Sequence, residues 1–316
     1  MSNSNLIYHY TSFEKLKCIL QYGTLRFKES TKSNDLLDTM GFVNILKNMP
    51  KFKAPIDMTA LLNFILGYYQ RDTYCSSAVS LVSCFSLTPD SRLLWDAYTM
   101  HRPGNQKCTY GEKKYCYETA TKYNGVCIAF RQDKLKELLE AEEGISCDKT
   151  HIQAIDYDEN KLKALINNWL KEAAYKSYEL SKDPDQSQSI IPSLQITRQT
   201  VLDFKKSLVV PSLEFLQNVE AYSPFYKHEF WREENEVRAS LLVTNGHLEK
   251  YKIQQSADGA KFRDISIAPD CIDHIILGPE FDDESFSEIK QHTDYKLNLL
   301  SFELKKSIGT GVIRNC

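Results

Sequence analysis

The order of strand-like and helix-like segments constrains the fold of this chain of 316 residues more than any other feature. Apolar runs typical of strands cluster toward both ends, whereas residues 159–180 and 195–221 have the apolar spacing of two long helices. The sequence lacks the regular alternation of strand and helix that indicates a parallel sheet. We therefore predict an α+β fold. It has a mixed, mostly antiparallel sheet in a single domain over residues 1–316, with a mostly helical insertion at about 159–222.

Composition and short motifs exclude several classes of protein. The net charge of −3 gives no overall positive field for nucleic acid, although it does not exclude a local basic groove. The phosphate-binding loops GxGxxG and GxxxxGKS/T are absent. No apolar run approaches the roughly 18 residues of a membrane span, and the N-terminal residues lack the pattern of a secretion signal. We expect a cytoplasmic protein without membrane association.

The nine cysteines are odd in number, scattered and without a CxxC pair. This usage indicates reduced thiols that mostly act as small core residues. His101, Cys108 and Cys116 are a conceivable zinc set, but their spacing is weak evidence and we expect no metal.

A strand that turns directly into a helix opens the chain, with the sequence "NLIYHYTSFEKLKCILQYG" at 5–23. Thr11 or Ser12 is in position to cap the helix, and Gly23 is in position to end it. His9 and Thr11 therefore lie at a strand-to-helix joint, where backbone amides often hold small anionic ligands. The alternative is a structural histidine followed by a helix cap.

A cluster of charges at the start of a later apolar strand is the second candidate for chemistry. Glu234, Glu236 and Arg238 are spaced by two, so on one strand they point the same way; if the strand begins at Glu236, Glu234 lies in the preceding loop. Repulsion between two carboxylates tends to raise one pKa, whereas Arg238 favours the ionised form. Such a pair suits one carboxylate that stabilises positive charge and one that deprotonates a nucleophile. The alternative is the solvated end of a helix.

The segment 101–124 differs from its surroundings because five basic residues and four tyrosines are interleaved there with only two glutamates. Basic side chains reach phosphates and aromatic rings stack on unpaired bases, which is typical of single-stranded nucleic-acid binding. The alternative is a solvated surface loop. The candidate substrate-binding residues are Arg102, Lys107, Tyr110, Lys113, Lys114 and Tyr115.

Several motifs spread over most of the chain resemble a bacterial family known only as domain of unknown function 2971. They are "YHYTS", "SND", "SCFSL", "LWDAY", "GVCIAF", "WREENEVR" and "HIILGP". The first motif also resembles the opening of ADP-ribosyltransferases, in whose RNA 2′-phosphotransferase, DNA-modifying toxin and poly-ADP-ribose polymerase branches a strand ends in His-x-Thr or His-x-Ser before a helix.

The second resemblance implies a split sheet of the ADP-ribosyltransferase type and NAD as a substrate. His9 would then bond the adenosine-side ribose and Thr11 the nicotinamide-side ribose, with Tyr10 between them as a further cofactor-binding candidate. Glu236 would bond the 2′-hydroxyl of the nicotinamide ribose, beside the developing oxocarbenium ion. Glu234 would orient or deprotonate the acceptor.

The same resemblance calls for an aromatic side chain that stacks on nicotinamide. Tyr98 is the candidate, with Trp95 as the alternative, although no tyrosine on a predicted strand matches the family's middle motif and both can be core residues. Asn34, beside Asp35, and Arg238 complete the candidate cofactor-binding set. The other role for Asn34 is in a turn or helix cap.

These features lead to three hypotheses. The first is an NAD-dependent ADP-ribosyltransferase that modifies RNA or DNA, acting as a toxin or anti-phage effector whose partner would be an antitoxin protein. The second is the same fold acting on protein or hydrolysing NAD. The third is a non-catalytic binding module.

Overall fold

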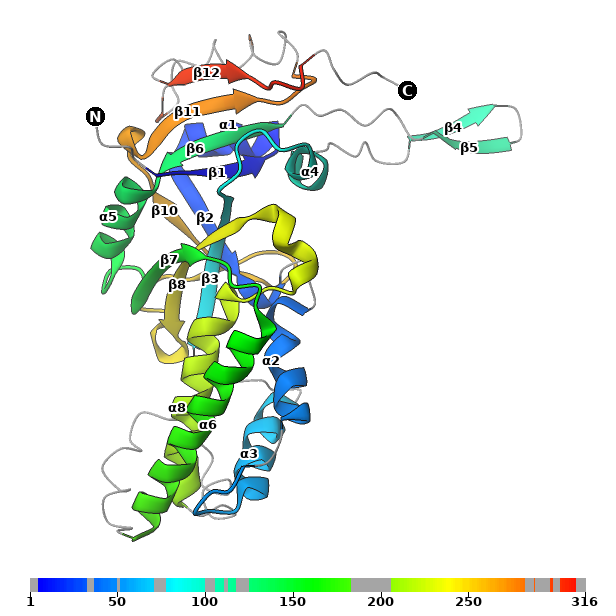
Figure 1. Cartoon of the computed structure of the whole chain (residues 1–316). Coiled ribbons are helices and arrows are strands. Elements are labelled where there is room, and N and C mark those ends of the chain that lie inside the picture. The colour runs from blue at the N-terminus through cyan, green and yellow to red at the C-terminus, as the bar shows by residue number, and fades with distance from the viewer. Residues whose placement is uncertain are drawn as a thin grey trace.

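The structure is a computed structural model with a sheet in its upper part and a group of helices in its lower part (Figure 1). It describes residues 5–32, 37–49, 52–70, 78–99, 106–110, 113–117, 125–182, 206–281, 287, 296–297 and 302–310. The sequence also predicts a helix near 283–292 and a strand at 295–302, and most residues of both lie outside the described ones.

A ten-stranded sheet forms the main body, with the strand order β12-β11-β6-β1-β3-β2-β10-β9 and a branch in which β8 joins β3 to β7. Among the described ladders, β11–β12 is the parallel one and the others are antiparallel. The prediction of a mixed, mostly antiparallel sheet is therefore confirmed. The strands are β1 (Leu6–Thr11), β2 (Thr24–Glu29), β3 (Ala78–Ser86), β6 (Val126–Arg131), β7 (Lys149–Ala154), β8 (Glu236–Thr244), β9 (Gln254–Gln255), β10 (Lys261–Ser266), β11 (Ile272–Leu277) and β12 (Glu303–Lys306).

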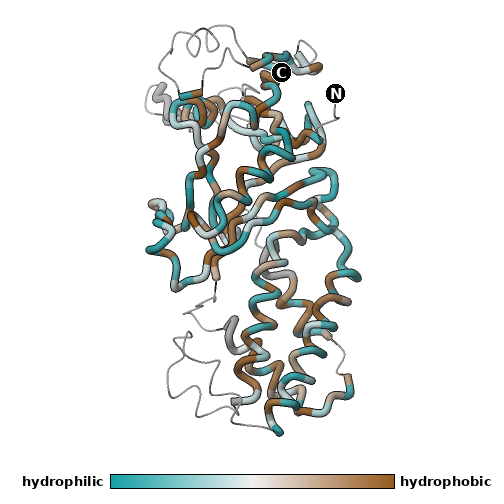
Figure 2. The backbone as a smooth tube through the Cα atoms, turned by 90° about the vertical axis from the view of Figure 1, so that its left-hand side faces the viewer, coloured by the Kyte–Doolittle hydropathy of each residue, from teal (hydrophilic) through white to brown (hydrophobic). Residues whose placement is uncertain are grey.

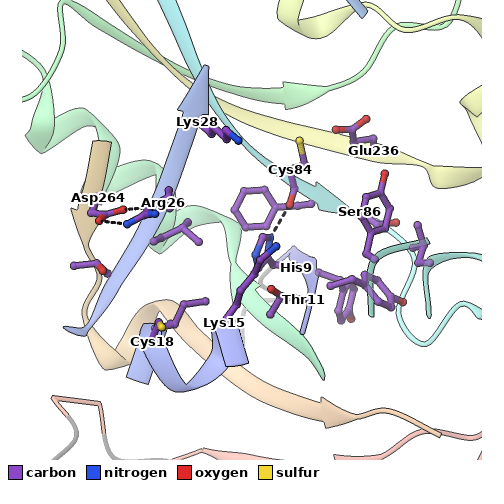
Figure 3. Close-up of a pocket in the computed structure, with 18 of the residues that line it drawn as sticks. His9, Thr11, Lys15, Cys18, Arg26, Lys28, Cys84, Ser86, Glu236 and Asp264 are labelled. Atoms are coloured by element: carbon purple, nitrogen blue, oxygen red, sulfur yellow. Dashed lines mark hydrogen bonds and ion pairs between the residues drawn. The ribbon is translucent and has the colours of Figure 1, made fainter. Parts of the chain in front are cut away.

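Strand β3 is paired along its whole length on one edge but only at two places on the other. The incomplete edge leaves an opening in the sheet. On one edge β3 pairs with β8 along nine positions, from Ala78 to Ser86. On the other edge, β2 pairs only at Leu81 and Val82, and β1 pairs only at Ser86. Because β1 and β2 leave β3 at separate places, a gap opens between them beside Cys84 (Figure 3).

Helix α1 (Phe13–Tyr22) connects β1 to β2 beside this gap. Ser12, rather than Thr11, is its N-cap, and the Ser12 hydroxyl accepts a hydrogen bond from the backbone N–H of Lys15 at 3.4 Å. Gly23 ends the helix with a φ of +58°, a left-handed conformation that glycine adopts without strain. The apolar face of α1 packs into the core of the sheet, so both predicted ends of this helix are confirmed.

Four helices in the lower part share a second hydrophobic core: α2 (Leu37–Asn48), α3 (Met58–Gln70), α6 (Glu159–Lys182) and α8 (Lys206–Tyr222). Hydrophobic and hydrophilic stretches alternate along these helices, as expected when each buries one face (Figure 2). The predicted insertion at 159–222 thus packs with α2 and α3, which come from residues 37–70. The assignment of one domain stays a prediction.

The remaining elements are shorter. Helix α5 (Gln132–Glu142) follows β6, and α4 (Arg92–Leu94) runs into a π-helical turn at Trp95–Thr99. Strands β4 (Gln106–Tyr110) and β5 (Lys113–Tyr117) form a separate hairpin inside the segment predicted as a loop. Within the part of the chain that the structure describes, no helix has the length and apolar character needed to cross a membrane.

The sequence "LEKYKI" at 248–253 predicts a short strand, and this prediction is wrong. Residues 248–253 form turns instead of a strand. Tyr251 and Ile253 are two residues apart, as on one face of a strand, but Tyr251 is buried while Leu248 and Ile253 pack against the sheet core from the turns. Burial of alternate residues therefore occurs here without a strand ladder.

Candidate active site

A pocket of about 450 Å³ fills the gap between β1 and β2 (Figure 3). Its volume lies within the range of small-molecule sites, about 300–1,000 Å³. Side chains from β1, α1, β2, β3 and the start of β8 line it. In Figure 3, His9 lies near the centre, with Arg26 and Glu236 on opposite sides of it.

The pocket brings together predicted site residues that lie far apart in the sequence. His9, Tyr10, Thr11, Tyr98, Glu234 and Glu236 all line it. Arg238 does not line the pocket, since it is buried behind Glu236. Asn34 and Arg102 lie outside the described residues.

His9 is held by a hydrogen bond from Nδ1 to the backbone oxygen of Cys84 at 2.8 Å. A carbonyl oxygen only accepts, so Nδ1 carries the hydrogen and Nε2 keeps its lone pair. Burial, together with the positive charge of Lys15, lowers the pKa of His9 despite this hydrogen bond. His9 is therefore a neutral imidazole at pH 7, with Nε2 free to accept a hydrogen bond.

Tyr10 and Thr11 complete the end of β1. The Tyr10 hydroxyl donates to the backbone oxygen of Thr88 at 2.9 Å and accepts from the backbone N–H of Ser91 at 2.9 Å. Its ring packs edge-on against Trp95, with ring centroids 5.0 Å apart. Tyr10 therefore braces the pocket wall against the turn that carries Tyr98. Since Ser12 caps α1, the Thr11 hydroxyl is not the cap.

The two candidate glutamates come from different elements. Glu236 begins β8 and shares a face of that strand with Arg238, as predicted from their spacing. Glu234 ends a 3₁₀ turn at Glu229–Glu234, and Asn235 turns the chain with a φ of +47°. Of the two alternatives left open by the sequence, the structure bears out the second, in which the strand begins at Glu236 and Glu234 lies in the segment just before it.

A lysine joins these two carboxylates. Lys227 Nζ lies 2.6 Å from Glu234 Oε2 and 3.3 Å from Glu236 Oε2. Arg238 binds Glu236 from the other side, with Nε 2.7 Å from Oε1 and Nη2 3.2 Å from Oε2. The four side chains belong to residues that are only 3–5% exposed. They form a buried set of two negative and two positive charges, which we call the buried charge quartet.

The quartet changes the electrostatics expected from the glutamates alone. Burial by itself raises the pKa of the Glu236 carboxyl, but Arg238 and Lys227 outweigh burial and hold this pKa below its ordinary value. Glu236 is therefore ionised at neutral pH. The repulsion expected between the two carboxylates is offset by cations that lie within hydrogen-bonding distance.

Tyr98 and Trp95 occupy different environments in the π-helical turn. The Tyr98 hydroxyl donates to Glu234 Oε1 at 2.8 Å, and the residue is 45% exposed on the pocket wall. Burial of the hydroxyl and the charge of Glu234 raise the pKa of Tyr98. Trp95 is buried, donates to Asp90 Oδ1 at 2.7 Å and does not line the pocket. Of the two aromatic candidates, only Tyr98 can contact a ligand here.

The opposite end of the pocket carries three cations. Arg26 forms a two-pronged ion pair with Asp264, with distances of 2.7 and 2.8 Å, and Lys28 lies 2.8 Å from Asp258. Lys15, on the first turn of α1, has no carboxylate partner among the described residues. Within the described residues, this end therefore offers one positive charge that is not paired with a carboxylate.

Sequence reasoning missed several of these residues. Arg26 and Lys28 alternate along β2, a pattern that could have identified them as neighbours on one face. Lys15 lies three residues after the helix cap and could have been placed beside His9. Lys227 lies in an irregular segment between two 3₁₀ turns, where no periodicity relates it to the glutamates.

The predicted substrate-binding residues lie mostly on the separate hairpin. Lys107 and Tyr110 belong to β4, and Lys113, Lys114 and Tyr115 belong to β5. Tyr110 pairs with Lys113 in the ladder, so cationic and aromatic positions face each other across it. In the described part of the chain, no cluster of histidine, cysteine or acidic residues could hold a metal ion.

Comparison with known proteins finds similarity to one family over part of the chain and assigns no activity. Residues 109–239 match DUF2971, a family of proteins of unknown function. The predicted resemblance to this family is confirmed over that segment, which contains the buried charge quartet but not His9. No curated protein and no solved structure gives a significant match.

Proposed function

We propose that this protein is an NAD-dependent ADP-ribosyltransferase that modifies a macromolecule, with nucleic acid as the favoured acceptor. The observation that carries the proposal is that His9 and Glu236 line one pocket, although they lie far apart in the sequence, in β1 and β8. The pocket joins a cationic end to an anionic end, which suits a dinucleotide with a diphosphate and a positively charged nicotinamide ring.

The charges suggest how the dinucleotide is oriented. Lys15 supplies the positive charge for the diphosphate, because Arg26 and Lys28 already bind carboxylates. Neutral His9 can accept a hydrogen bond from a ribose hydroxyl through Nε2. The nicotinamide ribose then extends toward Glu236, with Tyr98 beside the ring.

The proposed reaction breaks the bond between the ribose C1′ and the nicotinamide nitrogen. The bonding electrons stay with nicotinamide, which leaves as a neutral molecule, and the ribose develops positive charge. Ionised Glu236 stabilises this charge most strongly in the transition state. A nucleophilic oxygen or nitrogen of the acceptor forms the new bond to C1′, and Glu234 takes the proton that the nucleophile loses.

Nucleic acid is the favoured acceptor because the β4–β5 hairpin combines lysines with tyrosines. A transferase that modifies nucleic acid in its own cell is toxic. The proposal therefore includes a role as a toxin or anti-phage effector, with an antitoxin protein that neutralises it. Protein modification or NAD hydrolysis requires the same pocket with a different acceptor.

One observation favours the second candidate function, a non-catalytic binding module. A carboxylate has about four lone-pair sites, and Arg238 and Lys227 already occupy three of those on Glu236. A glutamate bound in this way can be a structural anchor. In that case the pocket binds its ligand without breaking a bond.

Label transfer tests the proposal. The purified protein is incubated with NAD that carries a radioactive adenylate phosphate, together with RNA, DNA or a protein extract. We expect label on RNA or DNA with the wild type, and at least about a hundredfold less with Glu236→Gln. Glu233→Gln is the matched control, because Glu233 is an exposed neighbour that does not line the pocket.

The other outcomes separate the alternatives. Label on protein alone, or free ADP-ribose alone, moves the assignment to protein modification or NAD hydrolysis. Intact NAD with every acceptor, together with NAD binding by the wild type, supports the binding module and contradicts the transferase.

A further inference from the structure

Lys227 does not line the pocket itself but contacts both glutamates that do, and it is an unusual lysine because it is only 5% exposed. It lies between the 3₁₀ turns Ser223–Phe225 and Glu229–Glu234. From there its ammonium contacts Glu234 and Glu236, the two carboxylates of the pocket.

Two further contacts hold Lys227 in place. Its backbone N–H donates to the backbone oxygen of Asp156 at 3.1 Å, which ties the segment to the end of β7. Its ammonium also lies over the ring of Trp231, 4.9 Å from the centroid. The side chain therefore cannot swing into solvent without leaving both the carboxylates and this ring.

The charge balance shows what Lys227 contributes. Arg238 binds Glu236 with two nitrogens, whereas Glu234 receives a charged hydrogen bond from Lys227 and a neutral one from Tyr98. Without Lys227, two buried carboxylates would share the single positive charge of Arg238. Two ionised carboxylates repel each other strongly in a buried site. One of them would therefore take up a proton at neutral pH.

The other groups that face the pair do not replace this charge. Tyr157, after β7, accepts a hydrogen bond from the backbone N–H of Glu236 at 3.0 Å, and the Cys84 side chain on β3 bonds the Glu236 carboxylate. Both are neutral groups. Among the described residues, Lys227 and Arg238 supply the positive charge in contact with the two carboxylates.

We propose that Lys227 is a positioning residue for the transferase reaction, which holds Glu234 and Glu236 as two ionised carboxylates at the pocket. In that state Glu236 stabilises the developing positive charge while Glu234 is free to accept a proton. This inference rests on the proposed function, but the charge state of the carboxylates is measurable without it.

The first test compares the pH profile of nicotinamide release in the wild type and in Lys227→Met. We expect the acid limb of the variant to move to higher pH by at least about one unit, because the pKa of Glu236 rises once the lysine charge is gone. The loss of rate is then largest at low pH and shrinks as the pH rises. Lys163→Met, which removes an exposed lysine on α6, is the control with an unshifted profile.

A loss of the same factor at every pH overturns the inference, because it indicates that Lys227 has a structural role only. The second test does not require activity. Carbon-13 NMR of labelled glutamate carboxyls follows the titration of Glu236 in the wild type and in Lys227→Met, with Glu236→Gln identifying the signal. A Glu236 carboxyl that titrates at the same pH in both proteins overturns the inference, and one that titrates at higher pH in Lys227→Met supports it.

The two tests keep the inference apart from the proposed function. Absence of nicotinamide release by the wild type contradicts the transferase, whereas the NMR titration still decides whether the carboxylate is held in its ionised form.

Discussion

The two ends of the pocket contain similar charges that are buried to different degrees. At the β2 end, the side chains in the Arg26–Asp264 and Lys28–Asp258 pairs are 27–59% exposed. At the glutamate end, the residues of the buried charge quartet are 3–5% exposed. Water screens the first pairs, so a ligand can break and replace them at small cost. Rearranging the buried charge quartet would leave buried charges unpaired, which costs much free energy. The quartet therefore keeps Glu234 and Glu236 in fixed positions at the pocket.

The largest expected effect is on stability, when a cation is removed from the buried end. Arg238→Met leaves Glu236 with one cation and the backbone oxygen of Pro224 without its 2.8 Å hydrogen bond. We expect a loss of about 3–5 kcal/mol in the free energy of unfolding, measured by urea denaturation. Arg26→Met at the exposed end should cost less than about 1 kcal/mol. Equal losses for the two variants would contradict the claim that charges at the buried end stabilise the fold more than charges at the exposed end.

The next effect is on ligand affinity at the exposed end. Lys15→Met should weaken NAD binding about tenfold, which corresponds to about 1.4 kcal/mol, and leave stability unchanged. Calorimetric titration measures it, and the salt dependence of binding should also decrease. Lys17→Met is the matched control, because Lys17 lies on the same helix, pairs with Glu14 and does not line the pocket. Equal affinities in all three proteins would exclude Lys15 as the diphosphate contact.

The third prediction concerns His9, which lies between the two ends. Its pKa is lowered in the folded protein, whereas an unfolded histidine takes up a proton near about pH 6.5. Below that pH the unfolded state binds a proton that the folded state does not, so stability falls as the pH drops. His9→Gln should reduce this fall between pH 7 and pH 5, measured as unfolding free energies at several pH values. An unchanged pH dependence would contradict a His9 whose pKa is lowered in the folded protein.

The smallest effect is expected for Lys28, which pairs with Asp258 in solvent. Lys28→Met should leave the melting temperature unchanged within experimental error, since screened ion pairs add little. A clear fall in melting temperature would show that the β2 end is more rigid than its exposure indicates.

The parts of the fold that the sequence predicts well depend on local signals. Ser12 and Gly23 define the ends of α1 from the residues next to them, and the apolar run "GVCIAF" at 125–130 predicts the core strand that the structure has as β6. The turn at 248–253 was misassigned because Tyr251 gains its burial from tertiary packing. Alternation of apolar residues does not distinguish that case from a strand.

The candidate site likewise includes residues that local sequence signals predict and residues that only the three-dimensional fold brings together. His9, Glu234 and Glu236 could be found because they adjoin predicted strands, whereas Tyr98 was a candidate only because the resemblance to ADP-ribosyltransferases implies an aromatic side chain. Lys227 could not be found, since only the three-dimensional fold brings its irregular segment to both glutamates. The pocket could not be predicted from the sequence either, because it depends on how β1 and β2 pair with separate parts of one edge of β3.

The most direct test of the central claim is the rate of nicotinamide release from NAD, measured by chromatography in the presence of nucleic acid. We predict release by the wild type and by Glu233→Gln at similar rates, and release at least about a hundredfold slower by Glu236→Gln. No release by the folded wild type, or equal release by wild type and Glu236→Gln, would contradict the claim that this pocket cleaves NAD.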